Sequence, residues 1–204
     1  MDALPPNAVT YLPVLVQEVR THWPEFGFGY LIAGQVEQET CYNLKHKKCW
    51  NPRAELKTAR EYGFGLGQLT ITAKFNNFEE AKKLHGSLHD WDFSERYDPA
   101  RQLRVMVLMD RNMYRAIKNA DDEAERIAMM FSAYNGGLGG LNQDRKLCAG
   151  QDGCNPGLWF GHVENTSFKK KTKTQGYGKS FFEINREYVT NIMFKRSDKY
   201  LPGF

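Results

Sequence analysis

The sequence predicts a mainly helical protein that folds as one domain. Apolar residues recur every three or four positions in several segments, which is the spacing of one face of an α-helix. The chain has 204 residues, long enough to bury a hydrophobic core without supporting disulfides or metals. Hydrophobic residues make up 41% and charged residues 25% of it. That balance is ordinary for a globular protein and excludes wholesale disorder.

Five segments show helical spacing, and they follow one another along the chain: residues 8–22, 31–40, 99–118, 121–137 and 180–196. The first, a packing helix, ends at Trp23-Pro24, because proline disfavours continuation of a helix. The third, which we interpret as core scaffold, begins at Asp98-Pro99. There the aspartate suits the N-cap and the proline suits the first helical position.

The stretches between these helices predict loops and turns. Residues 41–56 are polar and predict a loop, and residues 71–97 predict short helices and loops. In Glu61–Thr70 three alternate glycines predict a turn whose backbone can approach a ligand closely. It lacks the patterns of phosphate and dinucleotide loops. The longest irregular region is residues 138–178, and we expect the part from about 146 to 178 to be a loop insertion that lines a groove.

The chain is mildly basic, with a net charge of +4, and would attract nucleic acid, anionic lipid or anionic polysaccharide. Lys45, Lys47 and Lys48 form a small cluster that either contacts an anionic ligand or is a solvated face. The basic run 169–173 lies near aromatic residues, as in single-strand binding proteins, but no folded nucleic-acid motif accompanies it. We therefore expect no nucleic-acid partner. No run approaches 18 apolar residues, so we expect no membrane span.

The four cysteines form two local pairs, Cys41 with Cys49 and Cys148 with Cys154. Each pair could close as a disulfide in an oxidising compartment or remain as free thiols. A zinc site that uses His46 with these cysteines is the alternative, but neither spacing fits a common zinc pattern. The first residues, Met-Asp-Ala-Leu-Pro-Pro, have neither the basic nor the apolar region of a secretory signal peptide.

The predicted helix over residues 31–40 carries a carboxyl group, Glu39, at the edge of its apolar stripe. The residues of that stripe, which we expect to face a core, are Leu31, Ile32 and Val36. Burial without a cationic partner disfavours the charged form, so we expect the pKa of Glu39 to rise from about 4.3 towards neutrality. Such a group can act as a general acid. A solvated glutamate beside Glu37 at a helix end is the alternative.

Three further side chains suit a polar ligand. Gln68 offers both an amide donor and an acceptor. Tyr134 and Asn135 stand where two glycines break the helix over 121–137, and a ring and an amide there could stack on a ligand and hydrogen-bond to it. An ordinary helix stop is the alternative for this last pair.

Four short motifs then occur in order: Gln38-Glu39-Thr40, Gly65-Leu66-Gly67-Gln68, Ala133-Tyr134-Asn135-Gly136 and Arg186-Glu187-Tyr188-Val189. In order and rough spacing the set resembles the motifs of the soluble lytic transglycosylase family, from about Leu31 to Met193. The resemblance implies a lysozyme-like, goose-type fold with a substrate groove, in which residues 1–204 form a single domain.

The resemblance also implies roles for individual residues. Glu39 would be the catalytic acid and base. The residues expected at the substrate are Thr40, Gly65, Gln68, Tyr134, Asn135, Tyr188 and Glu183. Three positions depart from the pattern: Tyr62 replaces the first glycine, Gly67 replaces the usual methionine, and Ile184 stands where a glutamate is common, with Glu183 one residue earlier.

The implied reaction is cleavage of the β-1,4 bond between N-acetylmuramic acid and N-acetylglucosamine in peptidoglycan, with no cofactor and no metal. Most glycosidases use two carboxylates, whereas these motifs supply one. Glu39 would therefore protonate the leaving oxygen, the substrate's N-acetyl oxygen would stabilise the sugar cation, and Glu39 would then deprotonate the C6 hydroxyl to give a 1,6-anhydro product.

Two alternatives remain open. One is a hydrolytic lysozyme on the same fold, with water activated by a second acid, for which the candidates are Glu183, Glu55, Glu61 and Asp90. The other is a non-catalytic cell-wall-binding or virion module. We expect a monomer whose partner is the glycan strand, acting on the bacterial cell wall in the periplasm. Since no signal peptide is evident, we expect a bacteriophage endolysin released through a holin, or a virion enzyme.

Overall fold

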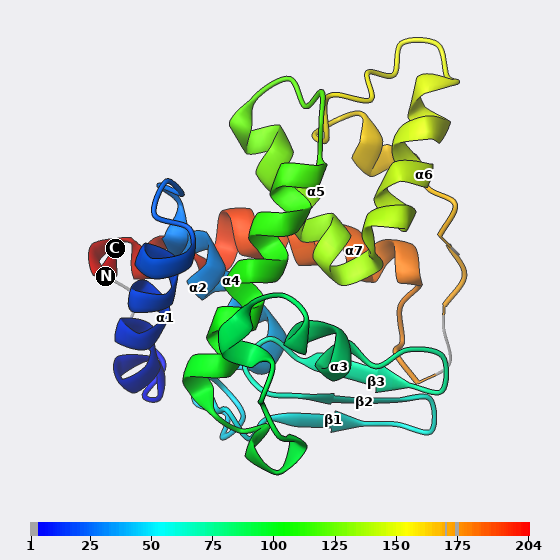
Figure 1. The fold of residues 1–204 in the computed structure, drawn as a ribbon. Coiled ribbons are helices and arrows are strands. Elements are labelled where there is room, and N and C mark those ends of the chain that lie inside the picture. Colours follow the sequence, from blue (N-terminus) through cyan, green and yellow to red (C-terminus); the bar gives the residue numbers. More distant parts are fainter. Residues whose placement is uncertain (1–3, 170, 174–175) are drawn as a thin grey trace. The chain divides into compact units, whose positions relative to one another are not determined.

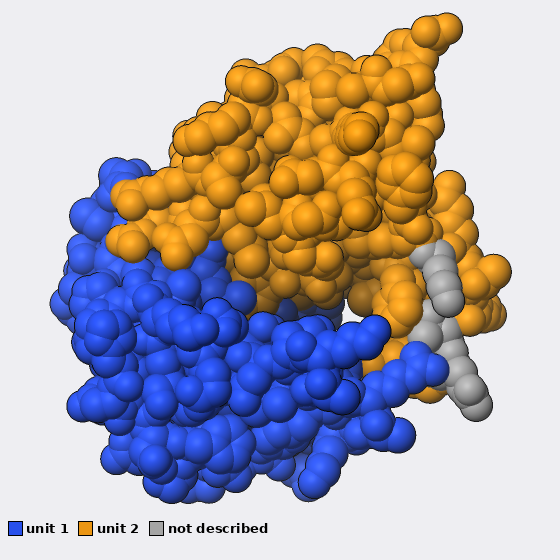
Figure 2. Space-filling model, turned by 45° about the vertical axis from the view of Figure 1, so that its right-hand side comes forward, with its two compact units in different colours: residues 1–109, 194–204 blue, residues 110–193 orange. Residues whose placement is uncertain are grey.

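The computed structural model describes residues 4–169, 171–173 and 176–204, so Lys170 in the basic run 169–173 lies outside the described residues. The chain forms two compact units, coloured separately in Figure 2. Unit 1 comprises residues 1–109 and 194–204, and unit 2 comprises residues 110–193. Helices dominate both units, which confirms the predicted mainly helical class (Figure 1). The single-domain organisation stays a prediction.

Unit 1 contains the first helices of the chain: α1 (Ala8–His22), α2 (Gly29–Thr40), α3 (Asn77–Lys82) and the beginning of α4 (Pro99–Ala116). The bounds of α1 agree with the prediction at both ends. α2 begins two residues before the predicted Leu31, and α4 ends two residues before the predicted Lys118. A short 3-10 helix, η5 (Asp198–Gly203), brings the C-terminal segment back against α2.

A three-stranded antiparallel sheet in unit 1 was not predicted. Its strands are β1 (Glu55–Lys57), β2 (Glu61–Phe64) and β3 (Leu69–Thr72), paired in that order. The prediction that Glu61–Thr70 is only a turn is therefore wrong, because only residues 65–68 form the turn between β2 and β3. Aromatic and β-branched residues favour strands here, but the strands are short and glycines interrupt their pattern.

The sheet and the helices near it enclose an aromatic core in unit 1. α3 packs beside β3, and the two 3-10 helices η1 (Gly86–Leu88) and η2 (Phe93–Glu95) follow, as expected for residues 71–97 apart from the strand at their start (Figure 1). The buried members of this core are Phe64, Leu69, Phe78, Ala81, Leu88, Trp91, Val105 and Leu108. This core holds β2 and β3, and therefore the turn between them, against α4.

Unit 2 is built from α5 (Glu123–Gly136), α6 (Leu138–Ala149) and α7 (Phe181–Asn191), with the 3-10 helix η3 (Val163–Asn165). α5 packs against both α6 and α7. Asp122 is the N-cap of α5, and its side chain accepts a hydrogen bond from the Glu125 N–H at 2.9 Å. After α7 the chain continues as a π-helical turn over residues 192–196.

The prediction that residues 138–178 are irregular is wrong for their first part, because α6 occupies residues 138–149. The buried positions of α6 are Leu141, Asp144 and Cys148, so an acid and a cysteine occupy places where the hydrophobic pattern needs apolar residues. Two glycines near the start of α6 also lower its helix propensity. The periodicity that revealed the other helices is therefore absent here.

The four cysteines close as two disulfides, Cys41–Cys49 and Cys148–Cys154, which confirms the local pairing. The zinc alternative with His46 is wrong, since both of its cysteines are bonded to each other. Among the described residues, no group of three or more metal-ligating side chains is placed to hold an ion. Across the same part of the chain, none of the helices combines the length and apolarity needed to cross a membrane.

Candidate functional site

Glu39 lies where a buried helix reaches the surface of unit 1. Leu31, Ile32 and Val36 are at most 4% exposed, so the predicted apolar stripe does face a core. Burial is not limited to a stripe, because every residue of α2 from Leu31 to Glu37 is buried. Glu39 itself is half-buried. The last turn of α2 thus places the carboxyl group of Glu39 at the edge of the unit.

Glu37, two residues before Glu39, is fixed by the C-terminal segment of unit 1. Its side chain is 2% exposed and accepts hydrogen bonds from Arg196 Nη1 at 3.2 Å and from Lys199 Nζ at 2.9 and 3.0 Å. The hydroxyl of Tyr200 donates to the same carboxylate at 2.6 Å. Burial, and then the hydrogen bond to Glu37, raise the pKa of Tyr200, so this phenol stays a donor.

This cluster, Glu37 with Arg196, Lys199 and Tyr200, is the Glu37 network. The sequence analysis named Glu37 only as the neighbour of Glu39 and did not predict the network. Its partners lie about 160 positions further along the chain. No spacing rule connects such distant charges, and the cluster of basic residues at 195–199 is the only sequence signal that pointed to it.

Thr40 and Trp50 tie the end of α2 to the loop that follows. The Thr40 hydroxyl donates to the Val36 carbonyl at 2.7 Å and accepts from the Trp50 N–H at 2.9 Å. The indole N–H of Trp50 donates to the Tyr200 hydroxyl at 2.9 Å, which joins this end to the Glu37 network. The Cys41–Cys49 disulfide closes the same loop. The Thr40 hydroxyl therefore hydrogen-bonds to the backbone on both sides of Glu39.

The turn between β2 and β3 holds Gln68. Its Nε2 donates to the Ala54 carbonyl at 3.1 Å and to the Gly65 carbonyl at 2.8 Å. A primary amide has two N–H donors, so both are used within unit 1, and Oε1 is the atom of this side chain best able to meet a ligand. Gln68 has a φ of +46°, an uncommon backbone conformation for a residue with a side chain.

Gly65 is required in this turn by both its conformation and its neighbours. Its φ is +81°, which side chains rarely allow, and an added Cβ would lie 2.6 Å from Cδ of Gln102. Gln102 is 2% exposed and accepts a hydrogen bond from the Leu66 N–H at 2.9 Å. Its Nε2 donates to the carbonyls of Pro52 and Arg96. Gln102, which sequence reasoning missed, thus anchors the turn from α4.

In unit 2 the structure brings together Tyr134, Asn135 and Tyr188. The rings of Tyr134 and Tyr188 are nearly parallel, with an interplanar angle of 8° and centroids 6.5 Å apart. Tyr188 is buried, Tyr134 is half-buried and Asn135 is exposed. Asn135 Oδ1 accepts a 3.1 Å hydrogen bond from Asn185 Nδ2, so α7 orients the amide at the end of α5. A half-exposed ring beside an oriented amide can bind a polar ligand with apolar faces.

Asn185 is itself fixed by its neighbours. It is 1% exposed, its Nδ2 also donates to the Ser132 carbonyl at 3.0 Å, and its Oδ1 accepts from the Ser132 hydroxyl at 2.9 Å. Arg186 donates to the same Oδ1 at 2.6 Å and to Asp144 at 3.0 Å. Burial lowers the pKa of Arg186, and Asp144 opposes that shift. Asp144 and Asn185 are thus supporting residues that the motifs did not reveal.

Glu183 caps α7. Its Oε2 accepts from the Ser180 N–H at 2.7 Å, while its own N–H donates to the Ser180 hydroxyl at 3.1 Å. These bonds form a capping box and lower the pKa of Glu183, chiefly through the backbone N–H of Ser180. The side chain is exposed. The arrangement gives Glu183 a structural role at the helix start.

Glu55, an acid of the lysozyme alternative, is bound by two phenols. Its Oε1 accepts hydrogen bonds from the hydroxyls of Tyr62, at 2.5 Å, and Tyr97. These two bonds lower the pKa of Glu55, so it is held as an anion. Glu61 is half-buried in β2, and Asp90 is exposed.

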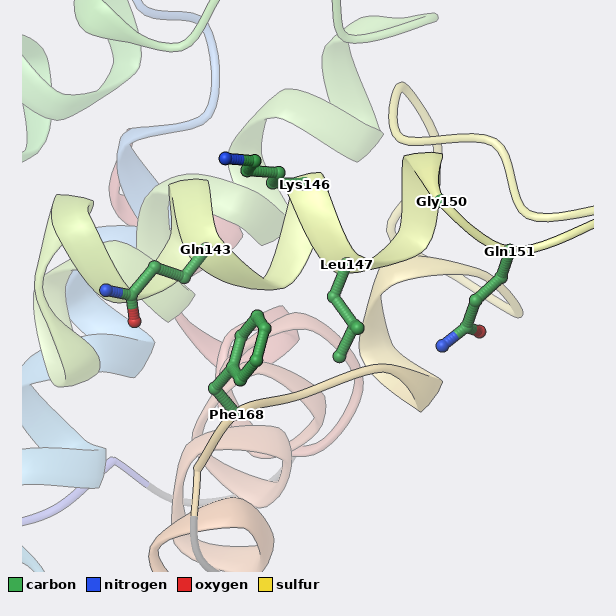
Figure 3. Close-up of a pocket in the computed structure, with 6 residues that line it drawn as sticks. All are labelled: Gln143, Lys146, Leu147, Gly150, Gln151 and Phe168. Carbon is green, nitrogen blue, oxygen red and sulfur yellow. The ribbon is translucent and has the colours of Figure 1, made fainter.

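Figure 3 shows a pocket of about 500 Å³ in unit 2. The Phe168 ring and the Leu147 side chain lie next to each other in it, and Gln143 and Gln151 lie at opposite ends of the row. Lys146 and Gly150 complete the lining. Five of these six residues belong to the region 146–178, but the pocket includes no residue of the four motifs.

The sequence resemblance implies a mainly helical fold, and in this structure a half-buried glutamate lies at the end of a buried helix. A comparison with known proteins supports the resemblance. Over 106 residues the chain is 29% identical to the membrane-bound lytic murein transglycosylase F of Alteromonas mediterranea. The match covers 50% of this chain and 23% of that protein. No protein-family model matches. The chain is thus a distant, partial homologue of a lytic murein transglycosylase.

Proposed function

We propose that this protein is a peptidoglycan lytic transglycosylase, a lysozyme-like enzyme that cleaves the β-1,4 bond between N-acetylmuramic acid and N-acetylglucosamine. The observation that carries the proposal is the position of Glu39, half-buried at the end of a helix that is buried from Leu31 to Glu37. The distant homology to a lytic murein transglycosylase supports the reaction class.

In the proposed reaction Glu39 transfers its proton to the glycosidic oxygen as the bond from that oxygen to C1 of the muramic sugar breaks. The carbonyl oxygen of the neighbouring N-acetyl group stabilises C1. The Glu39 carboxylate then takes the proton of the C6 hydroxyl, and O6 bonds to C1 to close the 1,6-anhydro ring. Glu39 ends protonated, as it began, and no water is consumed. Partial burial helps a carboxyl group to carry that proton near neutral pH.

The hydrogen bonds that Glu183 and Glu55 already make support a mechanism with one carboxyl group. A hydrolytic lysozyme needs a second carboxylate as base or nucleophile. Glu183 caps α7 and Glu55 is bound by two tyrosines, so both already have structural partners. The other two candidates for that alternative are Glu61, which is half-buried in β2, and Asp90, which is exposed.

For the substrate we assign contacts in each unit separately. In unit 2 the half-exposed Tyr134, supported by Tyr188, would pack on the apolar face of a sugar, and Asn135 would hydrogen-bond to an N-acetyl or hydroxyl group. In unit 1 Gln68 would accept a hydrogen bond through Oε1, since its N–H donors are used internally. Gly65 would contribute by holding the turn in shape.

The test is digestion of insoluble peptidoglycan followed by mass spectrometry of the released disaccharides. We expect anhydro products, each lighter by one water than the product of hydrolysis. Glu39→Gln should abolish release and keep the melting temperature, because it removes the proton and keeps the shape. Glu79→Gln on α3 is the control and should cleave normally. Products that retain the water would support the lysozyme alternative, and no release by the unmodified protein would support a non-catalytic module.

A bacteriophage setting stays a prediction from the sequence.

A further inference from the structure

The loop closed by the Cys41–Cys49 disulfide carries only positive charge. It follows α2 directly and contains Lys45, His46, Lys47 and Lys48, and no acidic residue occurs anywhere between Thr40 and Glu55. Neither the proposed reaction nor the fold of unit 1 uses the ammonium groups of Lys45 and Lys47. We name residues 41–49 the basic loop.

The backbone of the basic loop is ordered by its own hydrogen bonds. The Cys49 N–H donates to the His46 carbonyl at 2.8 Å, and the His46 N–H donates to the Asn43 carbonyl at 3.1 Å. From outside the loop, Asn7 Nδ2 donates to the Cys49 carbonyl at 2.9 Å. With the disulfide, these bonds hold the loop in one conformation, so binding an anion there would cost little ordering entropy.

The charged groups of the loop face solvent. Lys45 and Lys47 are exposed, and in the part of the chain that the structure describes neither ammonium group pairs with a carboxylate. Tyr42 is 89% exposed, and its ring stands edge-on to His46 with centroids 6.3 Å apart. Lys48 differs, since its ammonium group donates to the Glu55 carbonyl. Unpaired cations beside an exposed ring attract an anion that also has an apolar part.

We propose that the basic loop binds the carboxylates of the peptide stems that peptidoglycan strands carry. This inference rests on the proposed function and adds a second contact between the protein and its proposed substrate. Lys45 follows Glu39 by six residues, so their backbones are at most about 22 Å apart. A strand cut at Glu39 therefore brings the stems of neighbouring sugars near the loop. Free carboxylates repeat along such a strand, which matches the row of lysines, and Tyr42 can pack on the stem's aliphatic side chains.

The test measures binding of the full chain with Glu39→Gln, which prevents cleavage, to insoluble peptidoglycan at low salt. Adding Lys45→Gln and Lys47→Gln should weaken binding roughly three- to tenfold and flatten its dependence on salt. The matched control adds Lys82→Gln and Lys83→Gln on α3, which gives the same change in net charge at residues that are ion-paired with Glu79 and Glu80. The control should bind as the Glu39→Gln protein, the parent of both variants, does. Melting curves should show that each variant folds.

A second arm uses glycan strands whose peptides an amidase has removed. The parent should bind these strands about as weakly as the Lys45→Gln, Lys47→Gln variant binds intact peptidoglycan. Equal binding of the parent to both polymers, or equal loss in the loop variant and its control, would overturn the proposal. A loop variant that loses affinity only for a short DNA duplex would also overturn it, in favour of nucleic acid. If the unmodified protein releases no disaccharide, the proposed reaction fails while this binding result still stands.

Discussion

The Tyr200 hydroxyl donates a 2.6 Å hydrogen bond to the carboxylate of Glu37, a buried side chain two residues before the candidate catalytic Glu39. Lys199 and Arg196 complete the Glu37 network from the same segment. The two glutamates of one helix turn thus have different environments. Glu37 holds the helix in place, and Glu39 stands half-buried at its end.

Removing the Tyr200 hydroxyl should therefore destabilise unit 1 around α2. Tyr200→Phe takes a donor from a buried carboxylate and an acceptor from the Trp50 indole, which should cost about 2 kcal/mol in the free energy of unfolding. Lys199→Met should cost about as much or more, because it leaves part of a buried charge uncompensated. Denaturant unfolding measures both. Two variants as stable as the parent would show that the network is dispensable.

Gly65→Ala should destabilise the protein by about 2 to 4 kcal/mol. The change strains a residue whose φ is +81° and drives a Cβ into Gln102. Gly86→Ala in η1 is the control, because an added Cβ there meets open space. The same unfolding measurement compares them. A Gly65→Ala protein as stable as the control would mean that the turn and Gln102 can rearrange freely.

The two disulfides should differ in their effect on cleavage. Replacing Cys41 and Cys49 with serine frees the loop next to Glu39, and the model for short closed loops gives a loss of about 2 to 3 kcal/mol in stability. Replacing Cys148 and Cys154 opens a loop of similar length at the end of α6. Both variants should melt lower, and the first should lose more of its cleavage rate at a temperature where both are folded. Equal cleavage rates in the two variants would show that the Cys41–Cys49 disulfide has no special role in supporting the site.

The capping box of α7 predicts a dependence on pH. Hydrogen bonds from Ser180 lower the pKa of Glu183 in the folded state, so its contribution to stability is present above the ordinary glutamate pKa and is lost as pH falls through the lowered value. Glu183→Ala should therefore lower the melting temperature at neutral pH, and the difference should shrink in acid. Glu187→Ala, which removes an exposed pair with Lys179, should change little at either pH.

Asn185→Ala should destabilise unit 2, as Tyr200→Phe should destabilise unit 1. It removes the partner of the Ser132 hydroxyl and of the Asn135 amide, and should cost about 1 to 3 kcal/mol. If Asn135 binds substrate as proposed, the variant should also cleave more slowly at saturating peptidoglycan. Unchanged cleavage in a folded variant would argue against a role for the orientation of Asn135.

The sequence predicted those parts of the fold whose evidence is local. Helical spacing of apolar residues located α1, α2, α4 and α5 within two residues of their ends. It also located α7, although the last five residues predicted for that helix form a π-helical turn. It failed for α6, because Asp144 occupies a buried position where a hydrophobic residue was expected. It also failed for the sheet, whose strands have only three or four residues, with a glycine in β2.

The supporting residues of the candidate site could not be predicted for a different reason. Glu37, Gln102 and Asn185 act through partners that are distant in sequence or are backbone atoms, and such contacts leave no periodic pattern. The motifs identified residues expected to meet a ligand, because those residue types have recognisable chemistry. The residues that hold them in place are identified only once the chain is folded.

The Glu37 network has a consequence for truncated forms of the protein. The buried carboxylate of Glu37 receives hydrogen bonds from Arg196, Lys199 and Tyr200. A chain cut before Arg196 would therefore keep a negative charge in the interior of unit 1 without these partners. Such a fragment should fail to pack α2 natively, even though Glu39 itself is intact.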